Sequence, residues 1–241
     1  MNNLIIVILA AGNGTRMKSN IPKVCHMVGD KTMIEHVVKT SKELGPEEIV
    51  VVVSKSNIEN IRKALQDTDV RLKIQYEPLG TAHAVLSAAP CCNGEKDLLV
   101  LLGDVPLITS KTLQKITVTK YDAVVVGFKD TDITNKCGRI VIHHNRITKI
   151  VEYAEATPLQ RAIKLCNSGM LWVKSQYVPY LNYIQNNNSK GEYYLTDIIK
   201  IMVSDGLVIG FLEAGMNECM GVNTQVDLSN ANKIYSSPGK K

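Results

Sequence analysis

The stretch from Leu4 to Lys23, LIIVILAAGNGTRMKSNIPK, constrains the fold of this chain more than any other. Its first six residues form an unbroken apolar run, rich in β-branched side chains, which small residues end at once. Such a run is typical of a strand that is buried on both faces. Glycines directly after it allow unusual backbone angles and let backbone N–H groups approach a ligand closely. The stretch therefore predicts a central strand that carries a ligand-binding loop.

The residues after this strand predict a polyphosphate site, because Arg16 and Lys23 follow the Gly12-Asn13-Gly14 loop and Pro22 stiffens the chain before the lysine. A Walker A loop would need Gly-Lys-Ser/Thr after its second glycine, and a dinucleotide fingerprint would need a glycine at Met17. Taken alone, the motif also fits a strand-to-helix turn with two surface cations.

The rest of the chain alternates expected strands and helices, which predicts an α/β fold with a Rossmann-like, mixed but mainly parallel sheet and helices on both faces. Strands are expected at 4–9, 48–53, 72–76, 98–102, 123–128, 139–143, 147–153, 165–173 and 207–212. Helices are expected at 33–44, 58–65, 81–89, from about 111, and at 177–184, 195–203 and 225–235. A hairpin is expected around His144-Asn145-Arg146.

We expect one domain over residues 1–228, with a nucleotide half up to about 110 and a second half from 111 to 228 built on it. Residues 229–241 would be the end of the last helix and a tail that frays from 236. The sequence shows no internal repeat, so no β-helix is expected.

Composition argues against several classes of protein. The 28 Lys and Arg residues against 23 Asp and Glu residues give a net charge of +5, and the basic residues are scattered along the chain. Only 5% of residues are aromatic, so no nucleic-acid binding is expected. The N-terminus lacks a basic region and its apolar run is too short for a signal peptide or a membrane span, which predicts a cytoplasmic protein. Its cysteines should be reduced, with vicinal Cys91-Cys92 in a loop, and its five histidines lack zinc-ligand spacing.

Two further segments suit a nucleotide and its metal. The Gln75 amide offers an acceptor beside a donor, which fits uracil, and Gly80-Thr81 allows close backbone approach, although a strand-edge glutamine and a helix cap are the simpler interpretation. The amide could also flip, so it excludes cytosine only weakly. Gly103-Asp104 follows the most apolar strand, where Mg²⁺ could bind, and Asn223 could add a second oxygen. A turn carboxylate before Pro106 and a helix cap at Asn223 are the alternatives.

The second half offers carboxylate, amide and glycine backbone groups suited to sugar hydroxyls. Singly each is weak, because Glu152 could be a solvated strand residue and Tyr194 could pack in the core. No set of residues for a covalent nucleophile is apparent. The candidates are Gly138, Glu152, Asn167, Tyr194, Thr196 and Asn223.

Nine segments in order, LAAGNGTRM, PK, QYEPLGTAHA, LLGDVPL, GRI, IVE, NSG, GEYYLTD and GVN, resemble the motifs of sugar-1-phosphate nucleotidylyltransferases. From Leu4 to about Leu228 the chain is similar to the N-terminal uridylyltransferase domain of the bifunctional bacterial enzymes that make UDP-N-acetylglucosamine. The resemblance implies Mg²⁺-dependent conversion of UTP and N-acetylglucosamine-1-phosphate into UDP-N-acetylglucosamine and pyrophosphate.

The same resemblance implies roles for individual residues. Arg16 and Lys23 would act on the triphosphate, and Asp104 and Asn223 would hold Mg²⁺. The nucleotide would be bound by Leu9, Ala10, Ala11, Gly12, Gly14, Lys23, Gln75, Gly80, Thr81, Gly103 and Asp104.

The sequence departs from that family at Pro78, often polar there, and at Cys137, often aromatic there. It also lacks the β-helix acetyltransferase domain, so we expect no acetyl-CoA-dependent activity and a monomer or homodimer. Two alternatives stay open: a nucleotidylyltransferase for glucose-1-phosphate, dTTP or CTP, and a non-catalytic regulator that binds sugar nucleotides.

Overall fold

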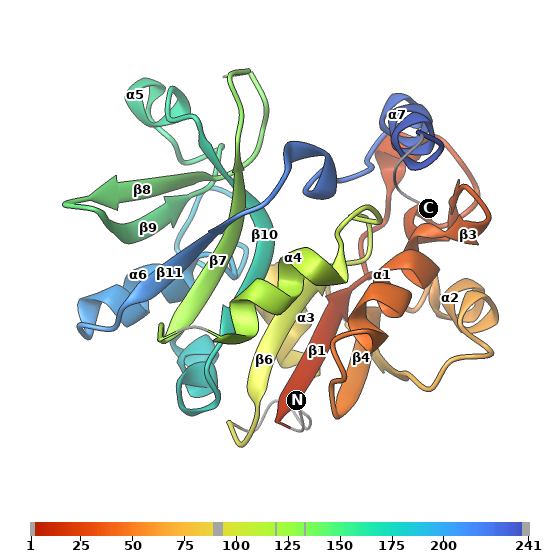
Figure 1. Cartoon of the computed structure of the whole chain (residues 1–241), viewed down its shortest axis with the longest axis horizontal. Coiled ribbons are helices and arrows are strands. Elements are labelled where there is room, and N and C mark those ends of the chain that lie inside the picture. The colour runs from red at the N-terminus through yellow and green to blue at the C-terminus, as the bar shows by residue number, and fades with distance from the viewer. Residues whose placement is uncertain (1–2, 89–93, 119, 133, 238–241) are drawn as a thin grey trace.

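A computed structural model describes residues 3–88, 94–118, 120–132 and 134–237 (Figure 1). The strands are β1 (Leu4–Leu9), β2 (Met27–Val28), β3 (Lys31–Thr32), β4 (Glu48–Val53), β5 (Arg71–Ile74), β6 (Asp97–Leu102), β7 (Ala123–Lys129), β8 (Arg139–His143), β9 (Arg146–Val151), β10 (Leu165–Val173) and β11 (Ile209–Glu213). The α-helices are α1 (Met33–Lys42), α2 (Ile58–Ala64), α3 (Thr81–Leu86), α4 (Ser110–Gln114), α5 (Pro158–Arg161), α6 (Asp197–Ser204) and α7 (Gln225–Tyr235). Short 3₁₀ helices are η1 (Thr15–Met17), η2 (Lys23–Cys25), η4 (Lys115–Val118), η5 (Ser175–Tyr183) and η6 (Met216–Glu218).

The main sheet has the strand order β11-β7-β10-β6-β1-β4-β5. Every neighbouring pair along this path is parallel except those of β10, which runs antiparallel to both β6 and β7. The hairpin β8–β9 joins the sheet through β10. The expected mixed, mainly parallel sheet is therefore confirmed, and β1 lies near its centre as a doubly buried strand should.

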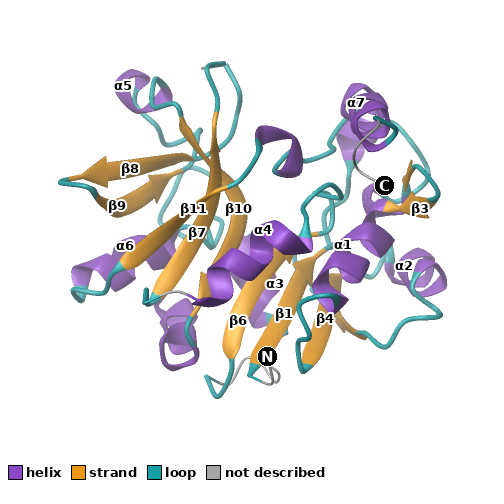
Figure 2. Ribbon diagram, viewed as in Figure 1, coloured by secondary structure: helices purple, strands orange, loops and turns teal. Residues whose placement is uncertain are grey.

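Helices cover both faces of this sheet, as expected (Figure 2). Alternate residues of β1 belong to different apolar clusters: Ile6 and Ile8 pack with residues of α1, α2 and α4, while Ile5 and Val7 pack with residues of α3 and α6. This alternation follows from the two-residue period of a strand. It explains why the β1 run contains no polar residue, since both of its faces are covered.

The main difference from expectation concerns residues 177–184, which were predicted as an α-helix. The chain instead forms the 3₁₀ helix η5 with Pro179 inside it. Proline cannot donate the backbone hydrogen bond that an α-helix needs, so the tighter 3₁₀ arrangement replaces it. The predicted helix 81–89 ends at Leu86 as α3, and residue 89 lies outside the described part of the chain.

Several short elements were not predicted, among them η1, η2, α5 and the β2–β3 ladder. Each is too short to show a hydrophobic period. Cys91-Cys92 and residues 238–241 of the expected tail lie outside the described residues. Within the described ranges, no helix is long and apolar enough to cross a membrane.

Helix α7 packs back against the N-terminal loop region. The Gln225 amide donates to the Met17 carbonyl at 3.0 Å, the Asn232 side chain accepts from Gly29 N at 2.9 Å, and the Tyr235 hydroxyl donates to Asp30 at 2.9 Å. The first bond holds the start of α7 to the loop that carries the two candidate cations, and the other two hold its end to the turn between β2 and β3.

Candidate active site

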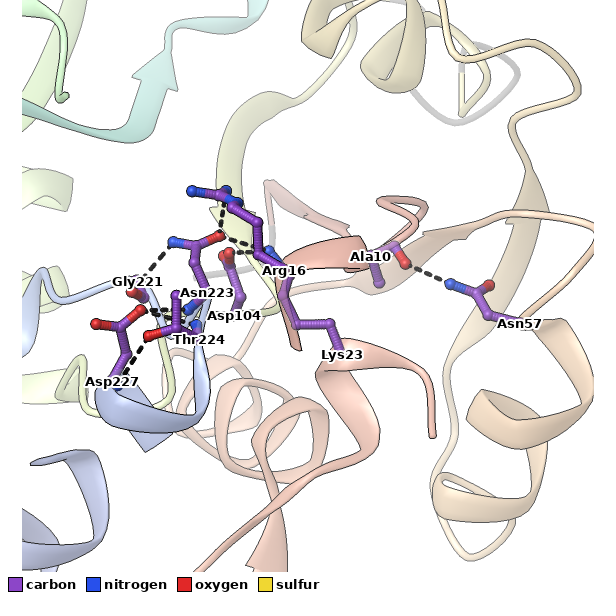
Figure 3. Close-up of polar contacts among 9 residues, drawn as sticks. All are labelled: Ala10, Arg16, Lys23, Asn57, Asp104, Gly221, Asn223, Thr224 and Asp227. Atoms are coloured by element: carbon purple, nitrogen blue, oxygen red, sulfur yellow. Dashed lines mark hydrogen bonds and ion pairs between the residues drawn. The ribbon is translucent and has the colours of Figure 1, made fainter. Parts of the chain in front are cut away.

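The loop after β1 forms an open backbone cradle. Gly14 has φ +60°, and a Cβ there would lie 2.6 Å from Lys23 Cβ, so only glycine lets the lysine approach so closely. A Cβ on Gly12 would meet nothing within 4 Å, which leaves that side free for a ligand. The Asn57 amide holds the cradle by donating to the Ala10 carbonyl at 2.8 Å (Figure 3). Asn57 was not singled out from the sequence, because its partner lies 47 residues away.

Four side chains from distant parts of the chain meet beside this cradle (Figure 3). Lys23 Nζ lies 2.5 Å from Asp104 Oδ2 and 3.1 Å from Asn223 Oδ1. Arg16 donates to the same Asn223 oxygen at 2.9 Å. The Lys23 and Asp104 side chains are only 14% and 17% exposed, so solvent weakens their attraction little. The predicted cation, carboxylate and amide residues therefore form one cluster.

The alternative that Asn223 caps the last helix is wrong. The N-cap of α7 is Thr224, whose side chain accepts from Asp227 N while Asp227 in turn accepts from Thr224 N. Asn223 donates its amide to the Gly221 carbonyl at 3.2 Å, which turns its oxygen toward the two cations. The neighbouring threonine thus frees Asn223 to serve the cluster.

This cluster fits a divalent metal of the magnesium type. Asp104 and Asn223 direct hard oxygen atoms at one cationic point, the Lys23 ammonium, so the protein already gathers oxygens around a positive charge. The described residues contain no group of three or more His, Cys, Asp and Glu side chains that would enclose a metal fully. Mg²⁺ is suited to such a sparse donor set because it takes most of its ligands from phosphates and water.

A cavity of about 330 Å³ opens from the cradle at the carboxyl ends of the strands, where open α/β sheets bind ligands. Gln75 lines it, and its Nε2 lies 3.1 Å from the Gly80 carbonyl and 3.2 Å from His83 Nδ1. A carbonyl oxygen can only accept, so the amide nitrogen must face Gly80 and the amide oxygen is left for a ligand. The predicted Gln75 thus has one chemically favoured orientation.

Gly80 and Thr81 are held by the segment before α6. Gly80 has φ +117°, and a Cβ there would lie 2.5 Å from the Tyr193 carbonyl, so the position requires glycine. Thr81 is the first residue of α3 and accepts from Leu195 N at 2.9 Å, while Ala82 N donates to Tyr193 at 2.9 Å. This first cavity and the GEYYLTD run are therefore one structural unit.

A second cavity of about 240 Å³ adjoins the first and contains most of the candidate sugar residues. Leu9, Thr81 and Leu102 line both cavities, so the two spaces meet at the ends of β1 and β6. Glu152 accepts from the Thr196 hydroxyl at 2.9 Å, and burial raises the pKa of its carboxyl. The predicted lining residues found here are Gly138, Glu152, Asn167 and Thr196.

Other candidates lie beside these cavities rather than in their walls. Tyr194 is 8% exposed, its hydroxyl has no hydrogen-bond partner among the described residues, and burial raises its pKa to about 12. Gly103 packs tightly, since a Cβ there would lie 3.2 Å from the Leu9 carbonyl. The remaining predicted residues outside the two linings are Gly14, Arg16 and Asn223.

Several lining or supporting residues were not assigned a role of their own from the sequence. Lys136 and Ser168 line the second cavity and Glu192 the first, while His83 contacts Gln75. Ser168, Glu192 and His83 lie within the motifs NSG, GEYYLTD and QYEPLGTAHA, so their segments were identified although their individual contacts were not. Lys136 lies outside every motif, and its place in the cavity wall depends on contacts between distant segments.

The model of the MobA-like NTP transferase domain family matches residues 6–169. The chain belongs to this family. It is therefore a nucleotidyltransferase, which confirms the enzyme class expected from the motifs. Enzymes of this class bind nucleotide and sugar phosphate substrates and generally use a divalent metal, in agreement with the chemistry of the cluster.

Relatives extend the similarity beyond the matched segment. The protein named bifunctional protein GlmU of Ruegeria pomeroyi is 37% identical over 238 residues, and that of Brucella anthropi is 39% identical over 236 residues. These matches cover 96% and 95% of this chain, but the chain spans only about half of the relatives, 52% of each. The resemblance to bifunctional enzymes inferred from the motifs is thus confirmed.

A solved structure with the same fold is that of a Bacillus anthracis protein assigned as a glucose-1-phosphate thymidylyltransferase and crystallised with sucrose. The TM-score is 0.76, and the match covers 96% of this chain and 94% of that one at 22% sequence identity. At this identity the likeness concerns the fold, and it confirms the expected nucleotidyltransferase architecture.

Proposed function

We propose that the protein transfers a uridylyl group from UTP to N-acetylglucosamine-1-phosphate and releases pyrophosphate. The observation that carries the proposal is the junction of a nucleotide-sized and a sugar-sized cavity at Leu9, Thr81 and Leu102. The cation cluster of Lys23 and Asp104 opens on the first cavity near this junction. A phosphate held between the two cavities would face both substrates.

The reaction needs no covalent nucleophile, because an oxygen of the sugar phosphate attacks the α-phosphorus in line with the departing pyrophosphate. The protein then has to align two polyanions and offset their repulsion with preorganised charge. Arg16 and Lys23 supply that charge from the loop, and Gly12 leaves backbone N–H groups open to phosphate oxygens. Asp104 and Asn223 would hold Mg²⁺, which when bound neutralises charge on phosphate oxygens.

The choice of base is supported by Gln75. With its amide nitrogen engaged by Gly80 and His83, its oxygen can accept from the N3–H of uracil or thymine. Cytosine presents an unprotonated N3 there, so two acceptors would face each other. This orientation argues for UTP or dTTP over CTP, and Pro78 also lines this cavity.

The choice of sugar is supported by the second cavity. The Glu152 carboxylate can accept hydrogen bonds from hydroxyl and amide groups, and the Asn167 amide can both donate and accept. Thr196 orients Glu152 by donating to it. Apolar lining residues such as Ile150, Leu195 and Ile199 suit a methyl group. An N-acetylated amino sugar combines these features.

We place the catalytic unit in residues 1–228, with the nucleotide half up to about 110 and the sugar half from 111. The ends of β1 and β6 supply the first cavity and β8 to α6 much of the second, which supports this division. We further propose that the unit works in the cytoplasm, where nucleoside triphosphates are made, as a monomer or homodimer.

The test is pyrophosphate release measured with the purified protein across a panel of nucleoside triphosphates and sugar-1-phosphates. UTP with N-acetylglucosamine-1-phosphate should be the best pair, and chelation of divalent metal should abolish turnover. Faster turnover of glucose-1-phosphate with dTTP would refute the substrate assignment. Binding of UDP-N-acetylglucosamine without turnover of any pair would indicate a non-catalytic regulator instead.

A further inference from the structure

The segment from Asn135 to Gly138 forms one wall of the sugar cavity and has little regular structure of its own. Its residues Lys136, Cys137 and Gly138 line the cavity together with Glu152 and Asn167. A Cβ on Gly138 would lie 3.5 Å from Glu152 Oε2, so the wall stands close to that carboxylate. Small shifts of this segment would therefore change the shape of the sugar site.

A fully buried arginine holds this segment from behind. Arg139 begins β8, is 0% exposed and is absent from the cavity lining. Its Nη2 donates to the Asn135 carbonyl at 3.0 Å, and its Nη1 donates to Asn135 Oδ1 at 2.9 Å and to the Cys137 carbonyl. Its Nε donates to the Arg161 carbonyl at 3.2 Å. The guanidinium thus fixes both ends of the Asn135–Cys137 turn.

Asn135 links this arginine to a buried carboxylate. Its Nδ2 donates to Asp130 Oδ2 at 3.0 Å, while its Oδ1 accepts from Cys137 N at 3.1 Å as well as from Arg139. Gly138 then accepts from Asn167 N at 2.9 Å, which ties the wall to β10. Asp130, Asn135 and Arg139 therefore form one network, called here the wall network, that ends at two cavity residues.

Stability alone does not account for the wall network. Burying a guanidinium costs desolvation free energy, and replacing buried charged groups by apolar residues often stabilises a protein. Here three of the oxygens that the guanidinium satisfies belong to one turn, the turn that lines the cavity, and a fourth is the Arg161 carbonyl. The planar fork of arginine is suited to hold several acceptors in fixed geometry.

We propose that Arg139 is a positioning residue for the acceptor sugar and acts through Asn135 and Asp130. It sets the place of the Cys137–Gly138 wall opposite Glu152 and thereby determines how tightly the sugar phosphate binds. This inference rests on the proposed function, because it assigns the second cavity to the acceptor. It does not involve the nucleotide, whose cavity shares no residue with the wall network.

The test compares Asn135→Ala with Asp132→Ala in steady-state kinetics. Asn135→Ala removes the bridge between Asp130 and Arg139, so KM for the sugar phosphate should rise roughly 10- to 100-fold, the range expected for one hydrogen bond to a charged group. KM for UTP should stay within about twofold, because the changed contacts lie outside the nucleotide cavity. Asp132→Ala is the matched control: among the described residues its exposed side chain bonds Thr134 alone, and the alanine keeps the backbone bonds by which residue 132 contacts Asp130 and Asn135.

A second measurement keeps the two proposals separate. Amide hydrogen exchange at Cys137 and Asn167 should accelerate in Asn135→Ala but not in Asp132→Ala, and Arg139→Lys should behave like Asn135→Ala if it folds. Unchanged exchange together with an unchanged KM for the sugar phosphate would refute the proposed role of the wall network. Equal rises in KM for UTP and for the sugar phosphate would refute it as well. If the wild type uses another acceptor, the KM comparison is made with that acceptor. If it turns over none, the proposed function fails. The role of the wall network is then tested by whether N-acetylglucosamine-1-phosphate slows amide exchange at Cys137 in the wild type and not in Asn135→Ala, and an equal effect in both would refute it.

Discussion

Replacing Asp104 by asparagine tests the cation cluster most directly. The carboxylate lies 2.5 Å from Lys23 Nζ, and both side chains are more than four-fifths buried. Breaking a buried ion pair by removing one partner typically costs about 3–5 kcal/mol, because the other charge stays buried. Asn223 Oδ1 still accepts from Lys23, so we expect the lower end, about 3 kcal/mol. For a chain of this size that lowers Tm by roughly 6–12 °C.

The activity of Asp104→Asn should fall more steeply than its stability. A neutral amide is a much weaker ligand for a hard dication, so turnover at limiting Mg²⁺ should drop by roughly 100-fold or more. Thermal unfolding and pyrophosphate release should be measured for Asp104→Asn, for Lys23→Met and for the double variant. In this cycle the two stability losses should not add, since residues in contact couple by about 0.5–3 kcal/mol. Additive losses, or wild-type turnover at limiting Mg²⁺, would refute the cluster.

Three further substitutions probe the other parts of the site. Arg16→Ala should lower kcat by roughly 10²–10³, more than it raises KM for UTP, because its charge acts mainly in the transition state. If steady-state kinetics instead show a change in KM alone, Arg16 binds the ground state. Gly14→Ala should displace Lys23, because the new methyl would lie 2.6 Å from Lys23 Cβ at φ +60°; isothermal titration should show weakened UTP binding, and unchanged affinity would contradict the close approach. Glu152→Gln should raise KM for the sugar phosphate and stabilise the protein near pH 8. Burial raises the pKa of Glu152 in the folded state, so its ionisation destabilises the fold as pH rises above the usual value near 4.5, and the difference in Tm between variant and wild type should vanish near pH 4.

Much of the architecture was predictable because it depends on local patterns. The apolar run of β1, the helical spacing of α1 and the glycines of the cradle each carry their signal within a few residues. Where a local rule was overridden, the cause was also local, as with Pro179 in η5. The antiparallel direction of β10 was not predictable, because a buried strand has the same composition in either direction.

The candidate site was predictable only as a set of residue types. The motifs indicated that Lys23, Asp104 and Asn223 carry the right chemistry, and no local pattern could show that their atoms meet. Asn223 had the helix cap as its better interpretation until the fold gave that task to Thr224. Likewise, the flip of the Gln75 amide was undetermined in the sequence and follows from the Gly80 carbonyl in the structure.

Arg139 shows most clearly which features the sequence determines and which depend on the tertiary structure. The sequence by itself determined the order of strands and helices, the glycine cradle and the family, since these follow from hydrophobic period, backbone freedom and motif spacing. Only the tertiary structure decided that the arginine of the Gly-Arg-Ile motif turns away from the cavity and into a buried network with Asn135 and Asp130. The physical reason is that the cost of burying a charge depends on which acceptors surround it. Asn135 and Cys137 lie close to Arg139 in the sequence, but the turn that presents their oxygens and the Arg161 carbonyl of α5 takes shape only when the chain has packed.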